Sequence, residues 1–132
     1  MPRTLLEKLG YRQGMPGLLH AVPEGLAPLF AEVEPGAPPV WIVGFCRDAA
    51  GVREAAKRLL PLYREGGHLW LCYPKRSGSI PTDITRDIGW EPVHAAGFLG
   101  VAQVAVDADW SALRFRRREE IREITRKSPT GG

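Results

Sequence analysis

Two apolar segments, 40–46 and 68–73, constrain the fold of this chain more than any other feature. They read V-W-I-V-G-F-C and H-L-W-L-C-Y, so neither alternates between polar and apolar residues. A strand that is apolar on both faces is typical of a parallel sheet with helices on both sides. Between the two segments, apolar residues recur at helical spacing: Val52, Ala56, Leu59, Leu60 and Tyr63. We therefore expect a strand-helix-strand unit, with Asp48 as the N-cap and Gly66-Gly67 after the helix.

The flanking segments extend this unit at both ends. Further strands are predicted at 17–22, 100–107 and 110–116, and the turn Asp107-Ala108-Asp109 makes the last two an antiparallel hairpin. Because helical crossovers between strands imply right-handed parallel pairing, we expect an α/β fold. The predicted architecture is a three-layer, Rossmann-like mixed sheet of about five strands that closes with an antiparallel C-terminal hairpin.

Shorter helices and loops are predicted between these strands. Helices are expected at 25–31, at 82–88 with Thr82 as the cap, and at 92–96, with a charged helix at 117–127. The proline-rich segment 34–39 is predicted to be a loop. We expect one domain, 1–127, followed by a flexible tail, 128–132.

The composition is that of an ordinary globular protein. The chain has 132 residues, a formal net charge of +3, 44% hydrophobic residues and 25% charged residues. No apolar run approaches the roughly 20 residues of a membrane helix, and the N-terminus lacks the apolar core of a secretory signal. Cys46 and Cys72 lie in apolar segments without metal or disulfide spacing, so we expect buried free thiols. These features predict a cytoplasmic protein without a membrane partner.

Three phrases of the sequence form a combined pattern: Y-P-K at 73–75, T-D-x-x-R-D at 82–87 and W-S-A-L-R-F at 110–115. The pattern resembles a bacterial family of small proteins of unknown function, and with weaker likenesses near the N-terminus it spans nearly the whole chain. The resemblance implies no activity. The order of elements also resembles the C-terminal half of Rossmann-like methyltransferases, which implies the strand order 1-2-3-5-4. Pro23-Glu24-Gly25 stands where a G-x-G fingerprint would be, so no nucleotide cofactor is predicted.

The loop after the segment 68–73 is the first candidate site. Open α/β sheets bind ligands at the carboxyl ends of their strands, and loops with free N–H groups or helix N-termini attract anions. The anion-site candidates are Lys75, Arg76, Ser77, Gly78, Ser79 and Thr82. The alternative interpretation is a solvated turn followed by a helix cap.

A second set of polar residues follows that loop. If segment 82–88 is helical, Asp83 and Asp87 share one face, where two carboxylates could hold a hydrated Mg²⁺ or act as acid and base. The alternative is a structural network in which Asp87 pairs with an arginine such as Arg114. Residues considered for such a network are Asp83, Arg86, Asp87, Trp110 and Arg114.

Three functional hypotheses follow. The first is a non-catalytic binding or regulatory domain for a small anion or a protein partner. The second is a small enzyme with Asp83 or Asp87 as acid–base group and Lys75 or Arg86 as anion clamp. The third and weakest is nucleic-acid binding through 114–118, where neighbouring glutamates offset the arginines. No catalytic residue, metal site or cofactor is predicted, because the three histidines lie on separate elements.

Overall fold

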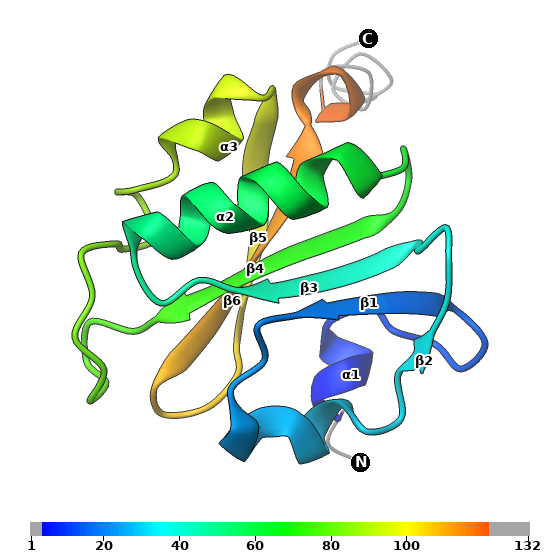
Figure 1. Cartoon of the computed structure of the whole chain (residues 1–132), viewed down its shortest axis with the longest axis horizontal. Helices are drawn as coiled ribbons and strands as arrows, with labels where there is room; N and C mark the ends of the chain where they lie inside the picture. Colours follow the sequence, from blue (N-terminus) through cyan, green and yellow to red (C-terminus); the bar gives the residue numbers. More distant parts are fainter. Residues whose placement is uncertain (1–3, 122–132) are drawn as a thin grey trace, which may run out of the picture.

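The computed structural model describes residues 4–121, which form one mixed six-stranded sheet in the order β2-β1-β3-β4-β6-β5 (Figure 1). The strands are β1 (Pro16–His20), β2 (Glu34–Pro35), β3 (Trp41–Phe45), β4 (His68–Pro74), β5 (Phe98–Ala105) and β6 (Trp110–Arg117). The four strands from β1 to β4 pair in parallel, whereas β6 is antiparallel to both β4 and β5. The predicted order of five strands is confirmed. The two-residue strand β2 was missed because it lies in the proline-rich segment that was predicted to be a loop.

Short helices precede or connect these strands: α1 (Leu5–Lys8), the 3-10 helix η1 (Glu24–Phe30), α2 (Ala49–Leu59), the 3-10 turn η2 (Leu60–Leu62) and α3 (Glu91–Ala95). The Asp48 side chain accepts a hydrogen bond from Gly51 N at 2.9 Å and so caps α2, as predicted. At its other end α2 tightens into η2, which contains Pro61. None of the helices in the described part of the chain combines the length and apolar character needed to cross a bilayer.

The sheet has one hydrophobic cluster on each face, which explains the two non-alternating strands. On the face covered by α2 and α3 lie residues such as Ile42, Leu69, Leu71, Leu113 and Phe115 (Figure 1). On the opposite face, residues near α1 and η1 are buried, among them Leu9, Phe30, Trp41, Trp70 and Trp110. Cys46 and Cys72 are free and fully buried, as predicted, and burial raises the pKa of Cys46 to about 12.

The predicted helix at 82–88 does not form, and the chain from 81 to 90 is irregular. Side-chain hydrogen bonds replace the helical ones there. The Thr82 hydroxyl donates to Arg47 O at 2.6 Å, and the Thr85 hydroxyl accepts from Asp87 N and Ile88 N. The predicted helix at 117–127 is described only in part: residues 118–121 are helical, and the rest, with the predicted tail 128–132, lies outside the described residues.

Candidate functional site

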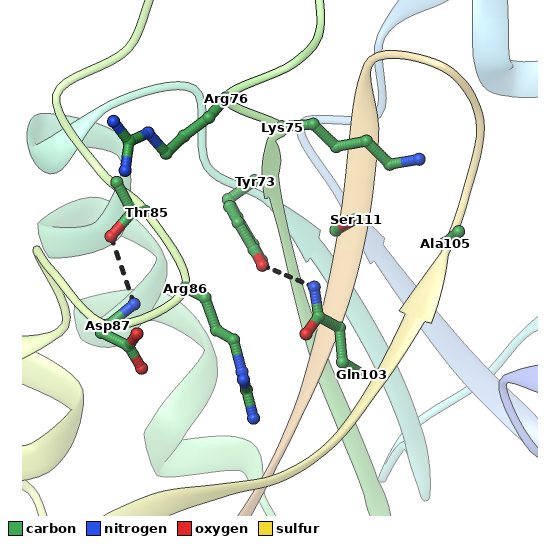
Figure 2. A pocket seen from close by; sticks show the side chains of 9 residues that line it. All are labelled: Tyr73, Lys75, Arg76, Thr85, Arg86, Asp87, Gln103, Ala105 and Ser111. Atoms are coloured by element: carbon green, nitrogen blue, oxygen red, sulfur yellow. Dashed lines mark hydrogen bonds between the residues drawn. The ribbon is translucent and has the colours of Figure 1, made fainter.

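An open cleft of about 600 Å³ lies at the carboxyl end of β4, on the face covered by α2 and α3 (Figure 2). Its walls come from the end of β4, the irregular segment 81–90, and the strands β5 and β6. The lining residues are Tyr73, Lys75, Arg76, Thr85, Arg86, Asp87, Gln103, Ala105 and Ser111. Ligands of open α/β sheets bind at this end of the strands, so the location is the one expected from the sequence.

Three cationic side chains and one carboxylate line this cleft: Lys75, Arg76, Arg86 and Asp87. Lys75 is half-buried, and the other three are exposed. In Figure 2, Lys75 and Arg76 leave the end of β4 in different directions, and the Arg86 side chain lies below Tyr73 and extends away from it. Within residues 4–121 the ion pairs closer than 4.0 Å are Arg58–Glu54 and Arg116–Glu120, so none of the four charges has a counter-ion at that distance. The cleft therefore carries an excess of uncompensated positive charge.

A tyrosine and a glutamine lie between these charges. Gln103 Nε2 donates a hydrogen bond to the Tyr73 hydroxyl at 2.9 Å (Figure 2). Burial raises the pKa of Tyr73, and its hydrogen bond with Ser111 and the nearby Arg86 charge only partly oppose that shift. Tyr73 is therefore a neutral phenol at physiological pH, with an oxygen that already accepts from Gln103. Its O–H group is a hydrogen-bond donor rather than a base.

The predicted anion loop, Ser77-Gly78-Ser79, is attached to the turn between β5 and β6. Ser79 donates from both its backbone N (2.7 Å) and its hydroxyl (3.0 Å) to Asp109 Oδ1, and these bonds lower the pKa of Asp109. Gly78 N donates to Lys75 O at 3.1 Å, and a Cβ on Gly78 would lie 2.8 Å from Asp109 Oδ1. Two of the loop N–H groups are thus already used within the protein. Those two amides are therefore not free to bind an anion in this conformation.

Thr82 and Asp83 line a second hollow of about 570 Å³, which shares Lys75 and Arg76 with the cleft. Asp83 Oδ1 accepts from Ala49 N at 2.8 Å, so this carboxylate stabilises the first turn of α2 together with the Asp48 cap. Asp83 and Asp87 do not share a helix face, because no helix forms there. Among the described residues, no group of three or more His, Cys, Asp or Glu side chains could hold a metal ion.

Trp110 and Arg114 do not reach the cleft, because strand residues alternate between faces. Both are on the opposite face from Leu113 and Phe115, as predicted for Trp110. The Trp110 ring is 6% exposed and lies 5.0 Å from the Phe45 ring, so it is a core residue. Arg114 Nη2 donates to Gly67 O at 3.3 Å, near the start of β4, and burial lowers its pKa. The proposed Asp87–Arg114 pair is therefore absent from the ion pairs of residues 4–121.

Glu120, which falls in the predicted charged helix 117–127, is a buried carboxylate. It is 4% exposed and accepts hydrogen bonds from Tyr63 Oη (2.6 Å), Gly66 N (2.8 Å) and Arg117 N (3.0 Å). Arg116 Nη2 lies 3.6 Å from its Oε2. Burial raises the pKa of Glu120, but the three hydrogen bonds and the Arg116 charge outweigh it, and the net shift is downward. No local pattern marks this residue, because Tyr63 and Gly66 are more than fifty positions away.

No protein-family model and no curated protein matches this chain. The resemblance to a bacterial family of unknown function therefore stays a prediction. Among solved structures, LepI in complex with SAM is 16% identical with a TM-score of 0.48. A LepI variant with SAH and a substrate analogue is 14% identical with a TM-score of 0.48, and a pericyclic reaction enzyme is 15% identical with a TM-score of 0.46.

In all three comparisons the aligned region covers 86% of this chain and 39% of the other chain. This chain thus spans well under half the length of the proteins that it matches. At these identities and TM-scores, the likeness assigns neither a ligand nor a reaction to the cleft.

Proposed function

We propose that the chain binds a small molecule bearing a phosphate or carboxylate group in the cleft at the end of β4. One observation carries this proposal: Lys75, Arg76 and Arg86 line a single cleft, and no carboxylate of residues 4–121 pairs with any of them within 4.0 Å. An anion that enters the cleft meets this positive charge without having to displace an internal partner.

The residue types suggest how the ligand would be held. Arginine guanidinium groups form paired hydrogen bonds with phosphate or carboxylate oxygens, and lysine adds a point charge. The Tyr73 hydroxyl accepts a hydrogen bond from Gln103, and its O–H group can donate a hydrogen bond to an oxygen of the ligand. Asp87 can accept from a hydroxyl or amino group of the ligand. These features favour a polar metabolite with both an anionic group and a hydrogen-bond donor.

Thermal unfolding with inorganic phosphate, pyrophosphate and citrate, together with ³¹P NMR titration of the two phosphorus-containing anions, would test the proposal. A ligand that binds only the folded state raises the melting temperature, and the effect grows with ligand concentration. We expect Arg86→Ala to weaken binding by roughly tenfold, since a hydrogen bond to a charged group contributes about 1.5–3 kcal/mol.

Arg64→Ala is the matched control, because Arg64 is also exposed but lies outside the cleft. The proposal fails if, at low ionic strength, none of the three anions changes the melting temperature and neither phosphate nor pyrophosphate shows a change in its ³¹P spectrum on adding protein. It also fails if Arg64→Ala weakens binding as much as Arg86→Ala, because that result would indicate a general response to surface charge.

A further inference from the structure

The two edges of the sheet differ in length and chemistry. At one edge, β2 consists of only Glu34–Pro35, and a short strand with a charge and a proline is a typical protected edge. At the other edge, β5 runs for eight residues, Phe98–Ala105, and within residues 4–121 it pairs only with β6. Its sequence, F-L-G-V-A-Q-V-A, contains neither a charged residue nor a proline. The β5 edge therefore lacks the charges and prolines that commonly prevent pairing with another strand.

In the described part of the chain, no strand pairs with the outer side of β5. Residues 100–103 are all exposed, including Val101 at 42%. Within residues 4–121, no backbone group of 99–105 makes a hydrogen bond outside the β5–β6 ladder. An antiparallel ladder uses only one side of a strand, so the remaining N–H and C=O groups point away from β6. The register shift at Val101 bends the strand, but it removes neither these groups nor the apolar character.

Two opposite charges lie alongside the middle of this edge strand. Arg86 and Asp87 line the cleft together with Gln103 and Ala105, and they also line a hollow of about 380 Å³ together with residues 99–102. Both side chains are exposed, and neither belongs to an ion pair of residues 4–121. A two-fold axis near the middle of β5 reverses the order of these two residues in the second copy, so a cation of one copy can face a carboxylate of the other. The edge thus presents one charge of each sign to its own copy.

We propose that β5 is a dimer interface, where it pairs antiparallel with β5 of a second copy to give one sheet continuous across both chains. The uncharged strand meets its own copy without like-charge repulsion, and the Arg86–Asp87 contacts add a specific charge match. Such two-fold contacts use the same surface on both subunits, which is the commonest symmetry of soluble oligomers. Because Gln103 and Ala105 of β5 also form a wall of the cleft, the second copy would lie beside the candidate anion site.

Sedimentation velocity over a range of protein concentrations, without added ligand, tests this interface independently of anion binding. We expect the wild-type chain to be a concentration-dependent dimer. Val101→Lys places like charges on both sides of the interface and should weaken dimerisation by about tenfold or more. Leu62→Lys is the matched control, because Leu62 lies in η2 and is 43% exposed, close to the 42% of Val101. Circular dichroism of both variants verifies that they fold.

Charge reversal gives a second, more specific measurement. Arg86→Glu and Asp87→Lys should each weaken the homodimer, and an equimolar mixture of the two variants should restore association, since glutamate then faces lysine across the axis. The proposal is overturned if the wild-type chain stays monomeric at the highest attainable concentration. It is also overturned if Val101→Lys and Leu62→Lys leave the same dimer, which would place the interface elsewhere. Association only with a foreign extended peptide would assign the edge to another partner and would equally overturn it.

Discussion

Charged side chains gather at two places in this molecule, and the two groups are used in opposite ways. Near the start of β4, Glu120 is 4% exposed and accepts hydrogen bonds from Tyr63, Gly66 and Arg117, with Arg116 close by. At the other end of β4, the charges of the cleft have no partner within 4.0 Å among residues 4–121. The charges around Glu120 are neutralised by hydrogen bonds and an ion pair within the protein, whereas those of the cleft remain available to a ligand.

The difference shows why residue type alone does not indicate function. A buried carboxylate is tolerated only when its hydrogen-bonding capacity is filled, so Glu120 and its donors must be present together. Exposed charges remain hydrated and contribute little to the free energy of unfolding. We therefore expect substitutions at Glu120 to change stability, and substitutions in the cleft to change binding.

The largest expected effect comes from Glu120→Gln. The amide keeps the shape of the side chain but loses the charge, and its NH₂ group faces donors instead of accepting from them. Loss of charge-assisted hydrogen bonds should lower the free energy of unfolding by about 2–4 kcal/mol. Urea unfolding followed by circular dichroism measures this change. Glu119→Gln is the control, because the neighbouring Glu119 is exposed, and it should change stability by less than about 0.5 kcal/mol. Equal effects of the two substitutions would contradict the buried role of Glu120.

A smaller change in the free energy of unfolding is expected when the pH is lowered. The pKa of Glu120 in the folded protein is below its ordinary value of 4.5, so the folded state favours the ionised form. The resulting stabilisation is fully present above pH 4.5 and is lost as the pH falls through the folded-state pKa. The difference in unfolding free energy between wild type and Glu120→Gln should therefore be constant near neutral pH and decrease in acid. A difference that stays unchanged down to the acid unfolding of the wild type would exclude this linkage.

The smallest change in the free energy of unfolding is expected from substitutions of arginines in the cleft. Arg76→Ala and Arg86→Ala remove exposed side chains without an ion-pair partner within residues 4–121, so each should change the free energy of unfolding by less than about 0.5 kcal/mol. Urea unfolding under the conditions used for Glu120 makes the comparison direct. A loss of more than about 1 kcal/mol from either arginine would mean that the cleft, like the Glu120 cluster, serves stability.

Only part of the candidate site could be predicted from the sequence, because some of its residues follow a strand directly and others meet through tertiary contacts. Lys75 and Arg76 could be placed at the carboxyl end of a strand because they directly follow an apolar parallel strand. Tyr73 and Gln103 could not be joined by sequence reasoning, because thirty positions separate them and the contact crosses β6, so it depends on the registers of two strand pairings. Asp83 was predicted to share a helix with Asp87, but it accepts from Ala49 N on a different element.

The sequence by itself determined the β-α-β unit, the cap at Asp48 and the closing hairpin, because each depends on contacts or periodicities within a few residues. The order of the five main strands was expected from the resemblance to Rossmann-like methyltransferases, and the tertiary structure has that order. Only the tertiary structure decided the conformation of segment 81–90 and the burial of Glu120. Thr82 is held by Arg47 O, and Glu120 is held by Tyr63 and Gly66. Those hydrogen bonds join elements far apart in the chain, where local propensity has no influence.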